Sequence, residues 1–478
     1  MEVILTADKT QTSNFRGQTY GGFYACLGNS YDNSLARHLI MPQTKRFMPI
    51  GLRKAESSLI NSGIKAKSVH IDEIEKNITK ETKFVCVSCV DPLGNGPTSG
   101  LFKIYNNEGS VLEKEFKYMM DKIKSLKAKH NFKVLAGGPG VQWLIGKEDY
   151  FGIDYLFFGE AEITLPKIIK NPPEKKIINA ELPKEHEITA IKAPSCFGAV
   201  EITRGCGRGC SFCAPATSGK IRNVDLNQII DEVKINVNAG YRKVSLRSED
   251  FLLYKNKKLI PQTDEVMELM KSVYNIKGVS EVNPIHSSFA SVLSNTELVD
   301  KLDGFFKSKG RKSFGFQPGI ETGSERLIRK YMLGKKYPFK QDWSEIVKES
   351  LAVLEKKRWV TTSTMIFGLP GETEDDLIAT ENLIDEIKDY STIIAPQIFV
   401  SYSNASMKDK KTEKIDYLRI KLINKCFRMD FKKAVKLNSS FSGKYNLRNI
   451  TQNSIAEYSF PFLNKIINKK EEELRKAV

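Results

Sequence analysis

Short runs of apolar residues alternate with longer amphipathic stretches along the first third of the chain. Runs that indicate buried strands occupy residues 2–7, 83–90, 132–140 and 153–160. Residues 113–130, which lie between two of these runs, place apolar side chains at helical spacing. This alternation predicts a parallel, doubly wound sheet, and we expect a Rossmann-like domain over residues 1–165.

Polar and glycine-rich segments follow several of the predicted strands. "DKTQTSN" follows the strand at 2–7, "DPLGNGPTSG" follows the strand at 83–90, and "GGPG" closes the run at 132–140. Sheets of this type bind ligands at the carboxyl ends of their strands. The sequence therefore predicts a ligand site at that edge of the first sheet.

The pattern breaks over residues 166–198, which hold five prolines and many charges and which we expect to be a linker with room for a short strand or two. A second alternation covers residues 199–402. Its candidate strands are residues 199–203, 243–249, 281–288, 313–321, 361–370 and 393–402. Six such units predict a partial (β/α)6 TIM barrel with its active site at the carboxyl ends of the strands. Residues 403–478 are expected to form a mainly helical, basic region.

The charge balance adds little about partners. The chain has a net charge of +17, and the segment from residue 401 onward holds 18 basic against 8 acidic residues. A basic surface attracts nucleic acid, acidic proteins or polyphosphates, although a solvated lysine-rich face is the more ordinary explanation. No nucleic-acid-binding signature, secretion signal or membrane-length apolar run of roughly 18 residues is present, so we expect a cytoplasmic protein.

Three of the eight cysteines are concentrated in "RGCGRGCSFC". Cys206, Cys210 and Cys213 have the spacing C-x3-C-x2-C in a loop after the strand at 199–203, and alternate glycines let the backbone bend there. Three thiolates can hold three irons of a [4Fe-4S] cluster and leave the fourth iron open. Zinc with a distant fourth ligand is the alternative, but none of the five histidines lies near this loop.

"CGRGCSFC", with an aromatic residue before the third cysteine, resembles the signature of the radical S-adenosylmethionine (SAM) enzymes. The resemblance implies the partial barrel, and it implies that the open iron binds SAM, which is cleaved to methionine and a 5′-deoxyadenosyl radical. "RSEDF" (247–251), "GIETGSE" (319–325) and "IFGLPGET" (366–373) agree with later family motifs in order. The SAM-contacting residues implied in this way are Phe212, Glu249, Asp250, Glu321, Thr322, Ser324 and Phe367. A helix N-cap by Thr322 or Ser324 is an alternative explanation of the second motif.

The first domain, with "AGGPG" and "DYLFFGEAE", resembles the cobalamin-binding subgroup of that family. The implied cobalamin contacts are Asp8, Lys9, Thr10, Ser88, Gly137, Gly138, Pro139, Gly140, Gly159 and Glu160. The chain lacks the D-x-H-x-x-G motif that supplies an axial histidine in many cobalamin proteins. Either the cobalt has no protein histidine ligand, as in many radical methylases of this subgroup, or the domain binds no cobalamin and "GGPG" is a plain strand-end turn.

The resemblance therefore implies a cobalamin-dependent radical SAM C-methyltransferase acting on an unactivated sp3 carbon. "ILTADKTQTSN" and "GGFYAC" are further similar to radical methylases of methane-producing archaea, some of which methylate side chains of methyl-coenzyme M reductase, including a glutamine carbon. A protein substrate, docked by the basic C-terminal region, and an electron donor such as ferredoxin or flavodoxin are the expected partners. We expect neither a membrane nor a nucleic-acid partner, and no side chain is identified as a catalytic acid or base.

Three alternatives remain open. A methylthiotransferase would use Cys26, Cys86 and Cys89 for a second cluster, although that group places its first cysteine directly after the first strand, where this chain has Ala7 and Asp8. The same cofactors also support cyclisation or rearrangement. A non-catalytic cobalamin or redox sensor is the third alternative.

Overall fold

The computed structural model describes residues 1–13, 25–26, 47–105, 109–214, 220–311, 314–403, 405–441 and 464–476. The chain divides into two compact units. The first comprises Met1–Ile202, Arg222–Leu246 and Ser272–Asn283, and the second comprises Thr203–Ile221, Arg247–Lys271 and Pro284–Val478. The division expected from the sequence, with boundaries after residues 165, 198 and 402, rests on hydrophobic patterning and remains a prediction.

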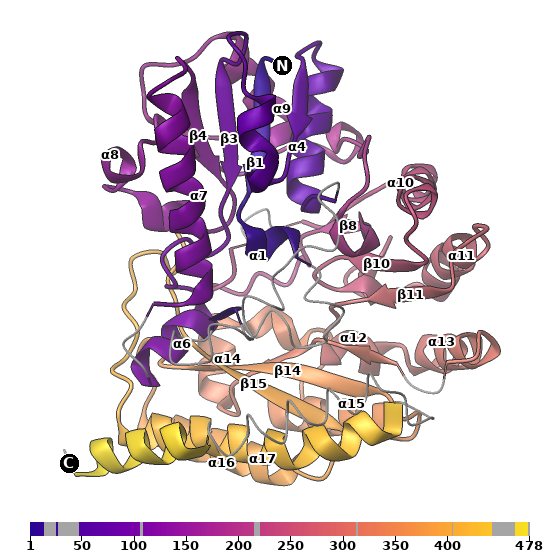
Figure 1. Ribbon diagram of the computed structural model, residues 1–478. Helices are drawn as coiled ribbons and strands as arrows, with labels where there is room; N and C mark the ends of the chain where they lie inside the picture. The colour runs from indigo at the N-terminus through magenta and orange to yellow at the C-terminus, as the bar shows by residue number, and fades with distance from the viewer. Residues whose placement is uncertain are drawn as a thin grey trace. The chain divides into compact units, whose positions relative to one another are not determined.

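The first unit contains a six-stranded sheet in the order β2-β1-β3-β4-β5-β6, and every neighbouring pair is parallel (Figure 1). Its strands are β1 (Val3–Ala7), β2 (Ala66–Ser68), β3 (Phe84–Ser88), β4 (Lys133–Gly137), β5 (Tyr155–Phe158) and β6 (Ile177–Asn179). All five residues of β1 are buried, as expected for a strand covered on both faces. The predicted doubly wound sheet is confirmed, and the order reverses between β1 and β3.

Helices cover both faces of this sheet (Figure 1). The helices of this part are α1 (Lys9–Thr12), α4 (Ile50–Asn61), α5 (Ile74–Asn77), α6 (Pro97–Tyr105), α7 (Val111–Lys127), α8 (Glu148–Phe151) and α9 (Ala161–Lys170). Apolar side chains of α4 and α9 pack with Val3 and Leu5 in one core, whereas those of α7 and α5 pack with Ile4 and Val85 in the other. Helix α7 begins at Val111, two residues before the expected stretch of 113–130, because Ser110 caps it, accepting a hydrogen bond from the Glu113 amide at 3.2 Å.

The later strands are β7 (Ala199–Glu201), β8 (Thr203–Arg204), β9 (Arg222–Asn223), β10 (Lys243–Arg247), β11 (Glu281–Pro284), β12 (Gly315–Phe316), β13 (Gly319–Glu321), β14 (Val360–Phe367) and β15 (Thr392–Ile398). Strands β11, β10 and β7 form one sheet, and β12, β13, β14 and β15 form another. The helices between them are α10 (Leu226–Asn238), α11 (Thr263–Tyr274), α12 (Phe289–Ser294), α13 (Thr296–Ser308), α14 (Glu325–Tyr331), α15 (Trp343–Glu355) and α16 (Glu374–Glu386). The predicted α/β class, with its repeated strand–helix units, is confirmed.

Two strand predictions need correction. The single strand expected over 313–321 is two strands, β12 and β13, which pair with β14 on either side of Gln317 and Pro318. Proline has no N–H to donate to a neighbouring strand, so pairing stops there. Strand β2 was not predicted, because its three residues are too few to show a periodic pattern. Strand β6 is a short strand of the kind expected within residues 166–198.

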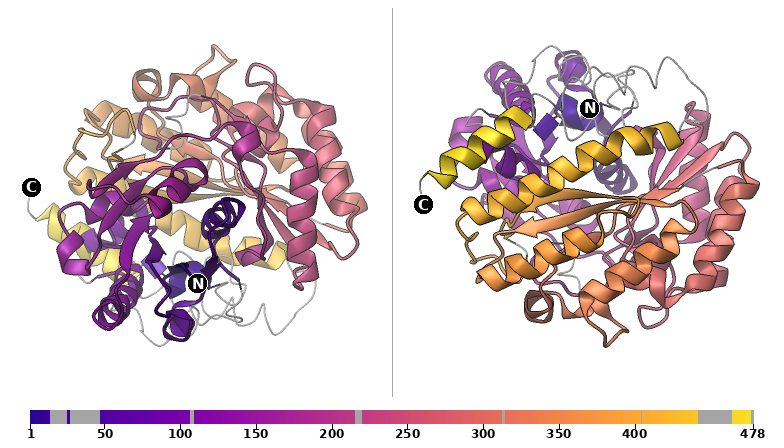
Figure 2. Two further views of the ribbon diagram at one scale, coloured as in Figure 1. Left: turned by 90° about the horizontal axis from the view of Figure 1, so that it is seen from above. Right: turned by 90° about the horizontal axis from the view of Figure 1, so that it is seen from below.

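Helix α17 (Tyr417–Phe441) opens the C-terminal region and packs against β15. Figure 2 shows this long helix running beside the strands of its sheet. The ammonium group of Lys425 lies 3.0 Å from Glu381 and 2.7 Å from Asp385, both on α16, so part of the basic charge is neutralised within the fold. No helix in the described ranges is long and apolar enough to cross a membrane.

Candidate functional site

The cysteine-rich loop follows strands β7 and β8. Gly205, Gly207 and Gly209 have φ angles of 78°, 70° and 68°, a region that favours glycine, so the predicted bending of this loop is confirmed. A turn between two of the cysteines is closed by the Cys213 amide, which donates to the Cys210 carbonyl at 3.1 Å. Cys210 is buried, whereas Cys206 and Cys213 are half-buried.

Arg208 anchors this loop from its centre. Its side chain is buried and donates from Nη1 to three backbone carbonyls, at 3.2 Å, 3.3 Å and 3.1 Å, which belong to Gly334, Lys335 and Tyr337. Its Nη2 donates to the Ser291 hydroxyl at 2.7 Å and lies 3.7 Å from the Asp250 carboxylate. Buried groups that satisfy several partners hold a unique geometry, so these contacts fix the centre of the loop.

The other end of the loop is held by backbone hydrogen bonds. The Ser211 amide donates to the Tyr331 carbonyl at 2.8 Å, and the Met407 amide donates to the Ser211 carbonyl at 3.2 Å. Phe212, expected to contact SAM, is half-buried on the turn that follows. Both flanks of the cysteine segment are therefore tied to later parts of the second unit.

A buried ion pair lies beside the cysteines. The ammonium group of Lys335 is 2.8 Å from Oε1 of Glu321, and both side chains are about nine-tenths buried. Burial raises the pKa of the Cys210 thiol to about 11; the positive charge of Lys335 opposes the shift, and the negative charges of Cys206 and Glu321 add to it. Burial likewise raises the pKa of Cys206. Burial therefore dominates at both thiols, and the positive charge of Lys335 offsets part of its effect on Cys210.

Among the described residues, no three His, Cys, Asp or Glu side chains converge on a point where one metal ion would fit. In a four-iron cube each cysteine binds a different iron.

Asp250, one of two acids expected to contact SAM after β10, is fully engaged within the protein. It accepts hydrogen bonds from Ser287, Ser288 and Ser291 at 2.9 Å, 2.7 Å and 2.7 Å. Glu249 is half-buried and close enough for its charge to contribute to the raised pKa of Cys206. A SAM contact by either acid remains a prediction, and the structure gives Asp250 a positioning role besides.

The residues of "GIETGSE" divide by function. Ser324 caps α14, since its hydroxyl accepts from the Leu327 amide at 3.2 Å, so the N-cap explanation is confirmed for this residue. Thr322 is buried, and its hydroxyl lies 3.1 Å from that of Thr380. Glu321 reaches Lys335 and the Thr364 hydroxyl with its two carboxylate oxygens. SAM contacts by these residues remain predictions.

The loop after β14 is covered by a segment that follows β15. Phe367, the expected adenine neighbour, is fully buried in β14. Beyond it, Glu372 accepts a hydrogen bond from the Gly368 amide at 2.9 Å and pairs with Arg419 at 2.6 Å. The Gly371 amide donates to Glu413 at 2.7 Å. The start of the C-terminal region thus supports this loop.

In the first unit, the expected cobalamin contacts gather where the sheet reverses its order. Asp8 caps α1 and accepts from the Gln11 amide nitrogen Nε2 at 2.6 Å, and Gln11 also accepts from the Ser88 hydroxyl at 2.8 Å. Thr10 is buried and donates to Asp8, whereas Lys9 pairs with Asp72 at 3.1 Å. This polar network lies at the carboxyl ends of β1 and β3, where doubly wound sheets bind ligands.

The glycines after β4 have a structural explanation. A Cβ at Gly138 would lie 2.6 Å from the Cys89 carbonyl oxygen, and one at Gly140 would lie 2.4 Å from the Val90 carbonyl oxygen. These glycines therefore allow the loop after β4 to contact the loop after β3, which agrees with the strand-end turn given above as the alternative explanation. Gly137 is half-buried and Pro139 is exposed at the same edge. Their contact with a corrin ring remains a prediction.

Two further expected contacts follow β5. Gly159 has a φ of 107°, and a Cβ there would lie 3.1 Å from that of Ala180. Glu160 forms a two-pronged ion pair with Arg222, at 2.5 Å and 3.0 Å. The Glu160 carboxylate thus has a protein partner, and its contact with cobalamin also remains a prediction.

Cys26, Cys86 and Cys89 belong to the first unit, and burial raises the pKa of each thiol, to about 11 for Cys26 and about 12 for Cys86. Cys86 packs in the core shared with α4 and α9, whereas Cys89 packs in the core shared with α7. Their side chains therefore point to opposite faces of the sheet.

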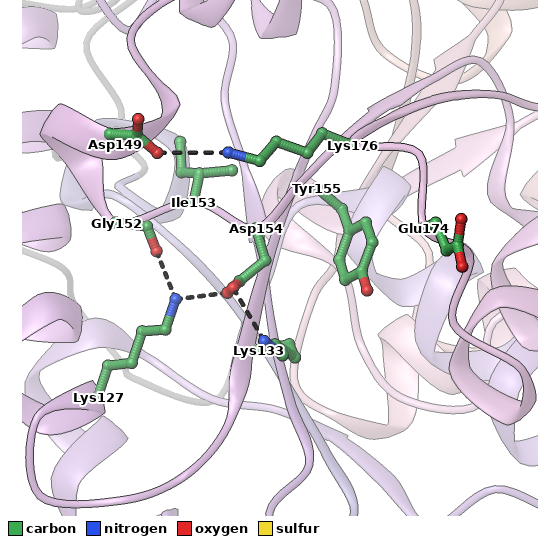
Figure 3. Close-up of a pocket in the computed structure, with 9 residues that line it drawn as sticks. All are labelled: Lys127, Lys133, Asp149, Gly152, Ile153, Asp154, Tyr155, Glu174 and Lys176. Atoms are coloured by element: carbon green, nitrogen blue, oxygen red, sulfur yellow. Dashed lines mark hydrogen bonds and ion pairs between the residues drawn. The ribbon is translucent and has the colours of Figure 1, made fainter.

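A cavity of about 340 Å³ opens at the other edge of the sheet, near the amino ends of β4 and β5 (Figure 3). Its lysines are paired with acids: Lys127 and Lys133 lie 2.5 Å and 3.5 Å from Asp154, and Lys176 lies 3.4 Å from Asp149. It lies at the amino ends of the strands, whereas the predicted site residues follow their carboxyl ends, where doubly wound sheets bind ligands.

Sequence reasoning missed Gln11, Arg208, Lys335 and Arg419. Arg208 lies inside the cysteine motif, so its position offered a clue. Lys335 stands in "LGKKY", where a buried lysine cannot be told from a solvated one by pattern alone.

Comparison with known proteins places the cysteine segment in a family. Residues 200–423 match the model of the Radical SAM superfamily. A tRNA-2-methylthio-N(6)-dimethylallyladenosine synthase of Thermodesulfovibrio yellowstonii is 27% identical over 58% of this chain and 62% of its own length. A ribosomal protein uS12 methylthiotransferase RimO of Leptospira biflexa is 24% identical over 40% of each chain.

A solved structure has a similar fold over most of the chain. It is the radical SAM methyltransferase TsrM of Kitasatospora setae, determined with cobalamin and a [4Fe-4S] cluster bound; the TM-score is 0.58 at 14% identity, covering 85% of this chain and 77% of TsrM. The expected [4Fe-4S] cluster and SAM agree with the family match. Residues 200–423, which carry the three cysteines, are therefore a radical SAM domain.

Proposed function

We propose that this chain is a cobalamin-dependent radical SAM methyltransferase that methylates an unactivated sp3 carbon. The observation that carries the proposal is the combination of two features in one chain. A radical SAM domain contains the three-cysteine loop, and it is preceded by a doubly wound sheet with a polar network at the reversal between β1 and β3. The fold similarity to cobalamin-bound TsrM supports the same assignment.

The residues of the loop fit an iron–sulfur cluster. Three thiols in a loop pinned by Arg208, with the ammonium group of Lys335 nearby, provide soft ligands and compensate negative charge. When bound, the cluster and SAM supply a hydrogen-abstracting radical, and cobalamin supplies the methyl group. The chain holds these groups, orients them and excludes water.

The cobalamin assignment rests on location. Asp8, Gln11 and Ser88 form a hydrogen-bonded set at the reversal point, which is where sheets of this order bind nucleotide-like ligands. Residues 8–13, which directly follow β1, include no histidine. We therefore propose that cobalamin binds at this edge without a histidine ligand from that loop. Protein expressed with abundant cobalamin should show cobalamin absorption bands; iron–sulfur absorption alone would contradict this part.

The substrate is proposed to be a protein side chain, specifically a glutamine of methyl-coenzyme M reductase. Support comes from the resemblance of the first loop to methylases of methane-producing archaea and from the basic residues after position 401. The pairing of Lys425 with Glu381 and Asp385 leaves less of that charge for docking. A ferredoxin or flavodoxin is the proposed electron donor.

Product analysis tests the proposal. Reconstituted protein would be incubated without oxygen with SAM, cobalamin, a low-potential one-electron reductant and a glutamine-containing peptide from the reductase. Methylation should add one methylene to the peptide and release equal amounts of 5′-deoxyadenosine and S-adenosylhomocysteine, because one SAM is cleaved and the second donates the methyl group. A Cys213→Ala variant is the control and should release neither.

Other outcomes separate the alternatives. Release of 5′-deoxyadenosine with a product of unchanged mass would contradict methylation and favour cyclisation or rearrangement. If neither this peptide nor any other candidate substrate gives 5′-deoxyadenosine, the enzyme assignment is wrong and a sensor role is favoured.

A methylthiotransferase is the second candidate, because the curated relatives carry that activity in their names. Such an enzyme would need a second cluster from Cys26, Cys86 and Cys89. Cys86 and Cys89 belong to cores on opposite faces of one sheet, so they are poorly arranged to share a cluster. Iron and sulfide analysis decides: one cluster per chain supports the methylase, and two would favour the methylthiotransferase.

A further inference from the structure

Lys335 carries a positive charge into the interior of the second unit, next to the cysteine loop. Its residue is 8% exposed, and its ammonium group lies 2.8 Å from the Glu321 carboxylate. Burial by itself lowers the pKa of Lys335, but the negative charges of Glu321, Cys210 and Cys206 raise it above its usual value. The negative charge of Glu321 therefore favours the ammonium form of Lys335.

The backbone brings Lys335 against the segment between Cys206 and Cys210. Arg208, midway between them, donates its guanidinium to the carbonyls of Gly334 and Lys335. A Cβ at Gly334 would lie only 1.9 Å from the Arg208 carbonyl oxygen, so the two backbones are in direct contact. The position of the Lys335 charge relative to the loop is thus fixed by neighbouring main chain.

The local backbone and a neighbouring hydroxyl group fix Glu321 in the position from which it pairs with Lys335. It has a φ of 67°, a strained value for a non-glycine residue, at an irregularity in the pairing of β13 with β14. One carboxylate oxygen accepts from the Thr364 hydroxyl at 3.0 Å, and the other faces Lys335. A Cβ at Gly319 would collide with this second oxygen at 1.8 Å, so the adjacent glycine leaves the room that the pair occupies.

We propose that Lys335 sets the reduction potential of the cluster bound by Cys206, Cys210 and Cys213. Glu321 positions the ammonium group of Lys335 and partly offsets its positive charge. The proposal rests on the proposed function only in requiring that cluster. Reduction transfers one electron from a low-potential donor to the cluster and adds one negative charge. A buried cation stabilises the reduced form more than the oxidised form, which raises the potential. Both residues are positioning residues rather than catalytic ones.

Two substitutions test this proposal: one removes the positive charge of Lys335 and the other removes the negative charge of Glu321. The potential would be measured by dithionite titration with redox mediators and electron paramagnetic resonance, on reconstituted full-length protein without SAM or cobalamin. Lys335→Met should lower the equilibrium constant for reduction about tenfold, equivalent to about 59 mV for one electron. Glu321→Gln should raise it by a similar factor, because the lysine charge loses its counter-ion. The double variant should return to within about threefold of the wild type if the two charges act as a pair.

Controls separate charge from structure. Lys335→Arg keeps the charge and should keep the potential, and iron and sulfide content is measured first for every variant. Unchanged potentials in Lys335→Met and Glu321→Gln with intact clusters would overturn the proposal, as would shifts of both in the same direction. If Lys335→Met does not fold, the rise in reduction potential expected for Glu321→Gln still tests the proposal. Failure of the wild type to bind any cluster would instead refute the proposed function, and this inference with it.

Discussion

The α-carbon of Gly334 faces the main chain of Arg208 so closely that a Cβ at position 334 would lie 1.9 Å from the Arg208 carbonyl oxygen. The Arg208 side chain turns back and donates to the Gly334 carbonyl at 3.2 Å. Both the main chain and the side chain of Arg208 therefore contact Gly334. This contact holds the cysteine loop against the turn after α14, and it requires that residue 334 has no side chain.

Gly334→Ala should disrupt the contact between residue 334 and the main chain of Arg208. The added methyl group must displace backbone rather than a flexible side chain, so we expect a loss of about 1–3 kcal/mol in unfolding free energy, typical of overpacking. Cluster loading after reconstitution should fall, because the segment between Cys206 and Cys210 has to move. Thermal unfolding and iron content measure the two effects.

Gly304→Ala provides the matched control. Gly304 lies in α13, and nothing lies within 4 Å of a Cβ built there. Alanine should stabilise the helix by about 0.5–1 kcal/mol and leave the iron content unchanged. Equal iron loading in the two variants would show that the Gly334 contact does not control the loop.

Substituting cysteines one at a time should separate cluster ligands from core residues. Alanine at Cys206, Cys210 or Cys213 is expected to abolish the visible iron–sulfur absorption, since a cube left with two thiolates is poorly held. Cys86→Ala should retain it, at a cost of about 1 kcal/mol for the lost packing. Loss of iron from the Cys86 variant at unchanged fold would revive the two-cluster assignment.

Much of the fold follows from the sequence because its strands are long and apolar. β1 and β14 were predictable in this way, and the cysteine spacing marked the loop that the family match contains. Strand β2 was not predictable, and the position of β6 within the linker was not either, since three residues show no period. The pairing of both strands is decided by neighbours distant in sequence.

The site was predictable where chemistry depends on residue type, and not where it depends on burial. The three cysteines are recognisable because few residues bind iron. Lys335 and Arg208 are two among 74 basic residues, and only the fold buries them. Gly138 and Gly140 were expected to allow a close approach, and in the structure the backbone of Cys89 and Val90 lies close to them, while a corrin contact remains a prediction.

Asp376 should contribute stability that depends on pH. Burial would raise its pKa, but hydrogen bonds from Arg326, Ser324 and Thr373 outweigh this and hold the pKa well below its usual range. Its contribution is therefore complete above the unfolded pKa, near 3.8, and is lost as the pH falls further. Asp376→Asn should cost about 1–3 kcal/mol near neutral pH.

Denaturant unfolding of this variant at several pH values checks the sign. The difference from the wild type should stay constant near neutrality and shrink once the pH drops below the usual Asp range. Glu374→Gln, an exposed change in the same helical turn, is the control and should cost less than about 1 kcal/mol at any pH. A difference that widens on acidification would contradict the assignment.

The buried pair of Lys54 and Glu232 yields a further prediction. Their charged groups are 2.5 Å apart, with side chains 4% and 0% exposed. Burial raises the Glu232 pKa, and Lys54 opposes that shift. Lys54→Met would leave the carboxylate buried without its cation, which typically costs about 3–5 kcal/mol. Because an acid with a raised pKa is destabilising where it must ionise, the deficit should be largest near neutral pH and should shrink on acidification.

The double variant Lys54→Met with Glu232→Gln distinguishes charge from packing. The glutamine oxygen can still accept from the Ile191 amide, which Glu232 does at 3.3 Å, but it carries no charge. We therefore expect the double variant to regain most of the lost stability and to lose the pH dependence, as measured by thermal unfolding between acidic and neutral pH. If it is as unstable as Lys54→Met alone, the cost arises from the lost packing of the lysine stem, and the charge account of this pair is wrong.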